Sequence, residues 1–225
     1  MWFADQWRVG QHKALVGPTD SGKTTYAVPV LKLRKYVIAL DPKGGDSRLA
    51  KSGFTPCPRW PPDSKILDGI AEGKPARLVV GFPCRTIADK KRLRTLQSNA
   101  LEGAFEMGGW TVYMDEFQVL ADRRMMGLDK LAEELLISAR DPKRMTIVTA
   151  YQAPAWVPTA STRQAQWFAI WKTLDVNIIK ALAEKMGRDW REMIRIMRTV
   201  PRHHIVIGGT DTDAPLIITK APRLS

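Results

Sequence analysis

The nine residues from Gly17 to Thr25, GPTDSGKTT, constrain the fold of this chain more than any other feature. They match the pattern GxxxxGK[ST] in full, and they lie between a short apolar run, His12–Val16, and a helix-like run, Thr24–Lys35. This is the context that a phosphate-binding loop requires, with a strand before the loop and a helix after it. Glycines let the backbone curve closely around phosphates, and the helix N-terminus presents partial positive charge to them.

Two side chains of this loop have predicted roles. Lys23 is placed to reach the β- and γ-phosphate oxygens, and the Thr24 hydroxyl to complete the shell of a Mg²⁺ ion. The alternative is a glycine-rich turn with an exposed lysine, which the flanking strand-like and helix-like runs disfavour. The sequence therefore predicts that the chain binds ATP with Mg²⁺. The residues expected to surround the nucleotide are Gly17, Pro18, Thr19, Asp20, Ser21, Gly22, Lys23, Thr24 and Thr25.

A second motif follows the apolar strand candidate Thr111–Met114, which ends in two adjacent carboxylates, Asp115 and Glu116. Adjacent acids at the end of a buried strand are costly to place inside a fold unless a cation or a proton transfer uses them. Beside a phosphate-binding loop, we expect Asp115 to orient the Mg²⁺ shell and Glu116 to polarise a water for attack on the γ-phosphate. The alternative is a strand that runs into an exposed acidic turn.

The third motif is the β-branched run Thr146–Tyr151, which is followed by Gln152. An apolar run that ends in a polar amide has the form expected of a sensor strand packed beside the acidic strand. Its amide could then contact the γ-phosphate or the attacking water. A strand-terminal glutamine is more often an ordinary hydrogen-bonding residue, so Gln152 supports the first two motifs and does not stand alone.

The order of apolar runs predicts an α/β fold with a mostly parallel central sheet flanked by helices, because strand candidates alternate with helical stretches. At 225 residues, one domain is expected, with a core over residues 12–172 and an α/β extension over residues 173–225. Thr55–Asp63 contains four prolines and is predicted to be a surface loop, and Gln152–Thr162 an irregular excursion. The strand candidates are His12–Val16, Tyr36–Leu40, Arg77–Phe82, Thr111–Met114, Met145–Ala150, Trp167–Trp171, Ile205–Ile207 and Leu216–Thr219. The main helix candidates are Thr86–Met107, Leu128–Ala139, a stretch after Asp175 and another through Trp190 and Met197.

The formal net charge is +12, from 35 basic and 23 acidic residues. This exceeds the magnitude of roughly 2–8 that is ordinary for a small domain, so a polyanionic partner such as nucleic acid is expected. A basic surface that serves solubility is the alternative. No run approaches the roughly 18 apolar residues of a membrane span, and the N-terminus has neither the basic nor the apolar region of an export signal.

With these motifs in order, the chain resembles the HerA–FtsK superfamily of P-loop motor ATPases. Four stretches carry the likeness: GPTDSGKTT, VIALDPKGGD at Val37–Asp46, VYMDEF at Val112–Phe117, and SARDPKRMTIVTAYQAP at Ser138–Pro154. Together they span most of the chain. The resemblance implies a RecA-like sheet of the additional-strand, catalytic-glutamate type, in which another strand separates the P-loop strand from the acidic strand.

The resemblance also implies a ring of five or six subunits around double-stranded DNA. In such rings an arginine of one subunit reaches the nucleotide of its neighbour, where positive charge offsets the charge on the γ-phosphate. Arg140 is the first candidate for this role by position, followed by Arg144 and Arg163. The alternative for each is an arginine that faces DNA or solvent.

Three differences from other members of the superfamily limit the kind of member that the chain resembles. The P-loop begins at residue 17, which leaves no room for the N-terminal barrel of HerA-like proteins, and neither a membrane anchor nor a nuclease domain is recognisable. The expectation is therefore a compact viral genome-packaging ATPase that translocates double-stranded DNA. Its portal or capsid vertex would be a further partner, and its location the host cytoplasm or the virion vertex.

Two alternatives stay open at this point. One is a Zot-like ATPase of phage assembly or secretion, although those proteins typically carry a membrane span. The other is a small-molecule or nucleotide kinase, which the Asp-Glu pair disfavours because a kinase transfers phosphate to a substrate hydroxyl and not to water. A kinase would gain nothing from DNA, whereas a motor should hydrolyse ATP faster on double-stranded DNA.

Overall fold

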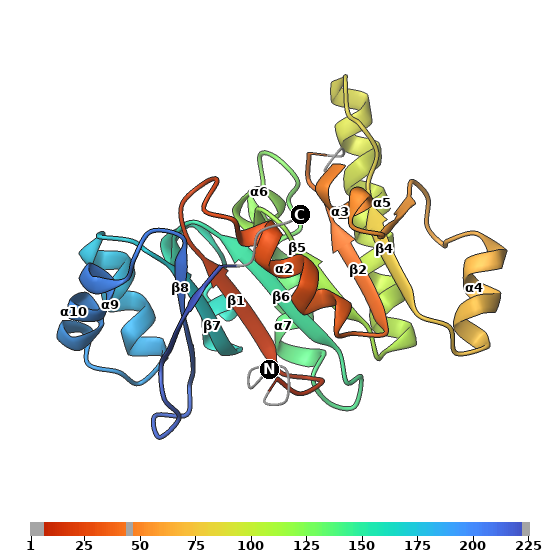
Figure 1. The fold of residues 1–225 in the computed structure, drawn as a ribbon. Helices are drawn as coiled ribbons and strands as arrows, with labels where there is room; N and C mark the ends of the chain where they lie inside the picture. The colour runs from red at the N-terminus through yellow and green to blue at the C-terminus, as the bar shows by residue number, and fades with distance from the viewer. Residues whose placement is uncertain (1–6, 44–46, 222–225) are drawn as a thin grey trace.

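The computed structural model describes residues 7–43 and 47–221, and within them one nine-stranded sheet runs through the molecule (Figure 1). The strand order is β3-β4-β2-β5-β6-β1-β7-β8-β9. The pairs from β3 across to β7 are parallel, whereas β7–β8 and β8–β9 are antiparallel. The strands are β1 (His12–Val16), β2 (Tyr36–Leu40), β3 (Thr55–Cys57), β4 (Ala76–Val80), β5 (Thr111–Met114), β6 (Thr146–Tyr151), β7 (Ala165–Trp171), β8 (His204–Gly209) and β9 (Ile217–Lys220).

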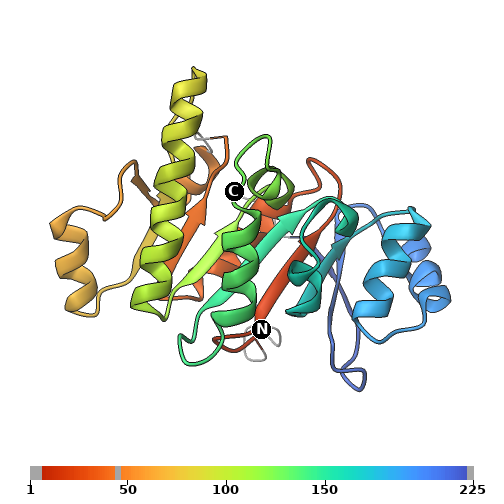
Figure 2. The same ribbon diagram turned by 180° about the vertical axis from the view of Figure 1, so that it is seen from behind.

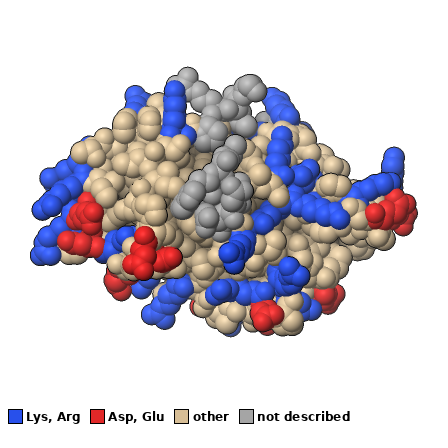
Figure 3. Space-filling model, turned by 60° about the horizontal axis from the view of Figure 1, so that its bottom comes forward, with Lys and Arg blue, Asp and Glu red and all other residues tan. Residues whose placement is uncertain are grey.

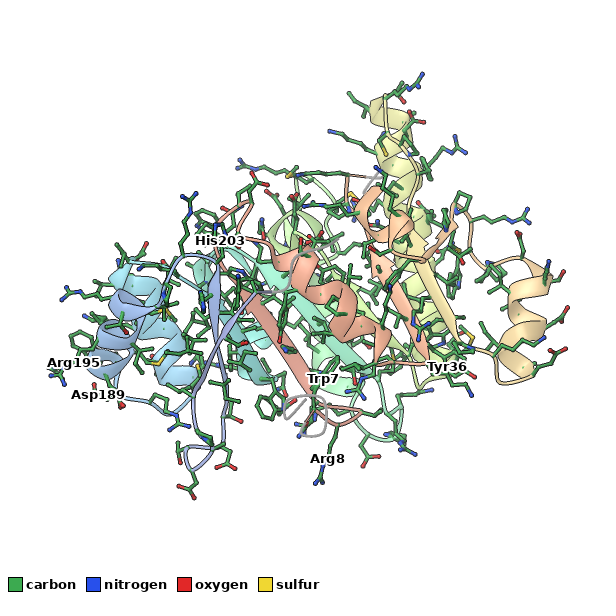
Figure 4. The ribbon with its side chains drawn as sticks, viewed as in Figure 1. Trp7, Arg8, Tyr36, Asp189, Arg195 and His203 are labelled. Carbon is green, nitrogen blue, oxygen red and sulfur yellow. The ribbon has the colours of Figure 1, made fainter. Side chains whose placement is uncertain are left out.

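Helices cover both faces of this sheet, because its central strands are apolar on both sides. Helix α2 (Lys23–Lys32) lies on one face, and α5 (Ile87–Met107) and α7 (Asp129–Ser138) lie on the other (Figures 1 and 2). At one end of the sheet lies α10 (Trp190–Thr199), near the labelled Asp189 and Arg195, and at the other end lies α4 (Ser64–Ala71) (Figures 1 and 4). The remaining helices are α3 (Ser47–Lys51), α4 (Ser64–Ala71), α6 (Phe117–Ala121), α8 (Ala160–Arg163), α9 (Val176–Lys185), α10 (Trp190–Thr199) and the 3-10 turn η1 (Pro154–Trp156). In the described part of the chain, no helix is long and apolar enough to cross a membrane.

The predicted fold class is confirmed. Strand β6 lies between the P-loop strand β1 and the acidic strand β5, as the additional-strand type requires. Strand β6 also pairs directly with β5, with Thr111 opposite Thr146, which confirms the expected place of the sensor strand. The longest predicted helix is confirmed as α5, where the Thr86 and Asp89 side chains each accept the other's backbone N–H in a capping box.

One local prediction was wrong. The proline-rich stretch Thr55–Asp63, predicted to be a surface loop, begins with the short strand β3, which pairs with β4 in parallel. Pro56 is tolerated there because β3 is the edge strand, where a missing backbone N–H removes no bond from the interior of the sheet. The excursion Gln152–Thr162 likewise contains the turn η1 and the start of α8. Residues 44–46 of the VIALDPKGGD stretch lie outside the described residues.

His12, the first residue of β1, is buried and bridges β1 to two other elements. The backbone N–H of Ile147 donates to His12 Nδ1 at 3.1 Å, so the proton resides on Nε2, which donates to the Leu136 carbonyl at 3.1 Å. Burial lowers the pKa of His12 from 6.5 to about 4. The carbonyl of Leu136 opposes this shift, and the positive charge of Arg140 adds to it.

We predict that His12 makes the fold less stable as the pH falls from 6.5 towards 4. In that interval the unfolded chain binds a proton at His12 that the folded chain excludes, so the free energy of unfolding decreases, by at most roughly 3 kcal/mol. In urea unfolding at several pH values, His12→Asn should flatten this part of the pH dependence. The control is His203→Asn at an exposed histidine, which should keep the wild-type slope. An unchanged slope in His12→Asn would contradict this assignment.

Candidate active site

The P-loop follows the carboxyl end of β1 and runs into α2, as predicted. Gly22 has a φ of 95° and Asp20 a φ of 57°, so the chain curves through the left-handed region twice before the helix begins. Gly17 has no room for a side chain, because a Cβ there would lie 2.6 Å from Cβ of Trp171 on β7. These constraints give the loop the tight curvature that a phosphate cradle needs.

Lys23 lies within the curve of this loop. Its Nζ donates to the carbonyls of Gly17 at 2.8 Å and Pro18 at 2.7 Å. Partial burial lowers the pKa of Lys23, while the negative charges of Asp115, Glu116 and Asp20 act in the opposite direction. The lysine predicted to bind phosphate and the two predicted carboxylates therefore share one electrostatic environment.

Asp115 is the buried carboxylate of the site and accepts hydrogen bonds from Thr24, Tyr113 and Glu116. Its Oδ2 accepts from Thr24 Oγ1 at 3.0 Å, and its Oδ1 accepts from Tyr113 OH at 2.9 Å and from the Glu116 N–H at 3.0 Å. Thr24 and Asp115 are 91 positions apart in the sequence, so their contact is a product of the fold. A hydroxyl beside a carboxylate is a ligand set that Mg²⁺ accepts together with phosphate oxygens and water.

Glu116 follows directly at the start of α6, with φ of 43° and ψ of 51°. This left-handed backbone is uncommon for a residue with a side chain, and such strain concentrates at functional sites. Glu116 Oε1 lies 2.5 Å from Nζ of Lys43, in an ion pair whose side chains are 29% and 71% exposed. The hydrogen bond to Glu116 raises the pKa of Lys43, as do the negative charges of Asp115 and Asp41.

Two hydrogen bonds hold the loop that carries Lys43 in place. The Lys43 N–H donates to Asp41 Oδ1 at 2.9 Å, immediately after β2. Gln97 of α5 is completely buried, and its Nε2 donates to the carbonyls of Asp41 at 2.8 Å and Val80 at 3.1 Å. Gln97 therefore holds the end of β2 beside the end of β4. The parallel pairing of β2 with β5 places Lys43 near Glu116.

Gln152 follows β6 and lies at the same edge of the sheet as the P-loop and Asp115. It lines a cavity of about 370 Å³ together with Gly17 and Pro18 of the P-loop, and with Asp175 and Ile178 near the start of α9. We refer to the edge formed by the carboxyl ends of the parallel strands as the carboxyl edge. The predicted P-loop, carboxylates and glutamine all meet there.

The residues present at the carboxyl edge fit a triphosphate with Mg²⁺. The P-loop curve leaves no space for a Cβ at Gly17, and Thr24 and Asp115 supply neighbouring oxygens. The buried Oγ of Ser21 in the same loop has no hydrogen-bond partner among the described residues. A bound phosphate would give this hydroxyl an acceptor.

The three predicted finger arginines lie at the opposite, amino edge of the sheet, which is marked by Trp7 and Arg8 in Figure 4. Arg140 and Arg144 precede β6, and Arg163 precedes β7; all three are exposed. Because β1 is five residues long, roughly 16 Å of strand separates the two edges. The fold therefore does not bring any of these arginines to the P-loop of the same chain.

Sequence reasoning missed three residues of the site, Tyr113, Lys43 and Gln97. Tyr113 had a detectable signal, because it precedes Asp115 by two positions and so lies on the same face of the strand. Lys43 stands in the DPKG stretch, but nothing in the sequence connects it to Glu116. Gln97 looks like any polar residue of a helix, and only the fold shows that it is buried.

Taken together, the sheet order, the P-loop after β1 and the acidic pair after β5 define a P-loop NTPase fold of the additional-strand type. The chain is similar to the DNA-packaging ATPase B204 of Sulfolobus turreted icosahedral virus, with a TM-score of 0.61, 18% identity, and coverage of 96% of this chain and 100% of that one. It is also similar to VirB4 of Thermoanaerobacter pseudethanolicus, with a TM-score of 0.60, 9% identity, and coverage of 95% and 89%. No family model and no curated protein sequence matches the chain. At such identities, the likeness establishes the shared fold.

We predict that Tyr113→Phe lowers the free energy of unfolding by about 1.5–3 kcal/mol, because it removes a buried donor from the ionised Asp115. Urea unfolding measures the change. Tyr36→Phe is the matched control, since Tyr36 OH makes only a 3.4 Å bond to the neutral Ile70 carbonyl. That variant should lose less than about 1 kcal/mol. Equal losses in the two variants would show that Asp115 does not depend on Tyr113.

Proposed function

We propose that this chain is an ATP-hydrolysing motor that translocates double-stranded DNA as a homo-oligomeric ring, in the manner of a viral genome-packaging ATPase. The observation that carries the proposal is the buried Thr24–Asp115 contact with Glu116 next to it. A second carboxylate beside the metal-binding one suits activation of water better than transfer to a substrate hydroxyl. The likeness to the genome-packaging NTPase B204 of Sulfolobus turreted icosahedral virus 2, solved with AMPPCP and with ATP-gammaS, supports the same conclusion.

Each residue has a definite task in this proposal. Lys23 and the P-loop N–H groups hold the phosphates, and Thr24 and Asp115 would hold Mg²⁺, which neutralises phosphate charge when bound. Glu116 orients a water and accepts its proton, and Gln152 senses the γ-phosphate from the neighbouring strand.

The position of the arginines supports the proposed ring. Arg140, at the amino edge, lies too far from its own P-loop to act there, so its role as a finger requires a second subunit. Arg144 and Arg163 share this edge and are the alternatives. The ring would have five or six subunits, so that each nucleotide lies between two neighbours.

Double-stranded DNA is the proposed substrate because the surface is rich in cations that could bind phosphates without reading bases. Figure 3 shows Lys and Arg side chains spread over the face that carries the amino edge. A portal or capsid vertex is the proposed docking partner, in the host cytoplasm or at the virion vertex. The likeness to the cytoplasmic domain of the type VII secretion ATPase EccC of Thermomonospora curvata, with a TM-score of 0.60, 12% identity, and coverage of 96% of this chain and 26% of that one, favours one alternative, a motor that moves protein.

We predict that Glu116→Gln reduces ATP turnover by roughly 10²–10⁴-fold while ATP binding is retained, because an amide cannot accept the proton of the attacking water. Steady-state phosphate release and equilibrium binding of a labelled ATP analogue measure the two quantities. Glu134→Gln, at an exposed glutamate of α7, is the control and should behave as wild type. Turnover at the wild-type rate in Glu116→Gln would remove the assigned role.

We predict that double-stranded DNA raises the ATPase rate and that DNA affinity falls steeply with salt. The logarithm of affinity should decrease with the logarithm of salt concentration, with a slope of about −0.9 per phosphate contact. The mass of the assembly, measured with nucleotide and DNA, gives the number of subunits in the ring. A rate that responds to a protein substrate and not to DNA would favour the protein-moving alternative.

A further inference from the structure

Trp171, the last residue of β7, packs against the P-loop at both of its glycines. Strand β7 pairs in parallel with β1, so Trp171 lies at the carboxyl edge beside the residue where the loop begins. A Cβ at Gly17 would lie 2.6 Å from Cβ and 3.1 Å from Cγ of Trp171, and a Cβ at Gly22 would lie 3.9 Å from its Nε1. The indole also meets the ring of Tyr26 on α2 edge-on, with 5.5 Å between the ring centroids. Trp171 therefore contacts the loop and the helix that follows it.

The indole N–H of Trp171 is a buried donor without an acceptor. Trp171 is 2% exposed, and its Nε1 forms no hydrogen bond with any residue that the structure describes. Such a donor costs free energy and requires an explanation in a native fold. Trp167, on the same strand and the same face of the sheet, differs in this respect, because its Nε1 donates to Gln11 Oε1 at 3.1 Å.

Two carbonyls of the P-loop accept hydrogen bonds from Lys23. Its Nζ donates to the Gly17 carbonyl at 2.8 Å and to the Pro18 carbonyl at 2.7 Å. With ATP bound, the proposed role of Lys23 turns these donors towards the β- and γ-phosphate oxygens. Both carbonyls would then lose the lysine. The Pro18 bond is exposed, so water can replace the lysine there, whereas the Gly17 bond is partly buried and needs a donor from the protein.

We propose that Trp171 positions the P-loop for ATP, because its indole N–H donates to the Gly17 carbonyl when Lys23 moves to the phosphates. The exchange supplies the missing acceptor of Trp171 and the missing donor of Gly17 with a single hydrogen bond. Trp171 acts through the loop backbone and does not contact the phosphates, so it is a positioning residue. This inference rests on the proposed function, from which it takes the phosphate contact of Lys23.

The central experiment follows the indole ¹H–¹⁵N NMR signals of the eight tryptophans without and with AMPPCP and Mg²⁺. The Trp171 signal is the one that Trp171→Phe lacks. If that variant does not fold, through-bond assignment of wild type identifies the signal. Because a new hydrogen bond moves an indole proton downfield, we expect the Trp171 signal to move downfield with AMPPCP and the Trp167 signal to stay in place. An unchanged Trp171 signal at saturating AMPPCP overturns the proposal.

Lys23→Met separates the exchange from the presence of a ligand. Methionine keeps an unbranched side chain and removes the N–H donors, so the Gly17 carbonyl loses the lysine without any nucleotide. We expect the Trp171 signal of this variant at the downfield position that wild type reaches only with AMPPCP. Lys32→Met, at an exposed lysine of the same helix, is the control and should keep the wild-type position. A Trp171 signal in Lys23→Met at the position of nucleotide-free wild type overturns the proposal.

The contribution of Trp171 to ATP affinity is measured in Trp171→Phe, which keeps an aromatic ring beside the loop and removes the donor. We expect the Kd for AMPPCP and the KM for ATP to rise roughly tenfold, which is the effect of one hydrogen bond to a buried group. The kcat should be unchanged, because Trp171 takes no part in the activation of water. Trp167→Phe is the matched control and should keep the wild-type Kd. Equal rises in the two variants, or a fall in kcat with KM unchanged, would overturn the assignment.

Three outcomes separate the sources of failure. If wild type does not bind AMPPCP, the proposed function fails and this inference fails with it. If Lys23→Met binds AMPPCP as tightly as wild type, the phosphate role of Lys23 fails, and the exchange loses its cause. If wild type binds AMPPCP, Lys23→Met does not, and the Trp171 signal stays in place, the inference alone fails.

Discussion

The buried carboxylate of Asp115 is the constraint on which the rest of the site depends. An ionised carboxylate in a protein interior is stable only when hydrogen bonds replace its water. Asp115 obtains three of them, from Thr24, Tyr113 and the Glu116 N–H. The first of these bonds joins the end of β5 to the start of α2 across the intervening strand β6. The same atoms that satisfy the carboxylate thereby place a P-loop hydroxyl where a divalent cation would bind.

Strand direction explains why the functional residues meet at one edge. Strands β2, β5, β6 and β1 are parallel, so the loops that follow them emerge at the carboxyl edge side by side. Lys43, Asp115, Gln152 and Gly17 each follow one of these strands. The same geometry sends Arg140 to the opposite edge, because it precedes its strand. Within one chain, Arg140 and the P-loop therefore lie at opposite edges of the sheet.

The ion pair between Lys43 and Glu116 joins a carboxylate of the candidate active site to an exposed side chain. Gln97 donates one buried hydrogen bond to Asp41 after β2 and one to Val80 of β4, so the backbone that precedes Lys43 is held in place while the lysine side chain stays exposed.

The sequence by itself determined the P-loop, the acidic pair, the place of Gln152 after a strand and the α/β order, because each is a short motif or a periodic apolar run. It also predicted the additional strand between β1 and β5 through the family resemblance. The sequence prediction was wrong at β3, because the prolines of Thr55–Asp63 indicated a loop where the structure has an edge strand. Only the tertiary structure decided the partner of Glu116 and the burial of Gln97. These depend on contacts between residues distant in sequence, such as Lys43 and Glu116, which are 73 positions apart and carry no shared local signal.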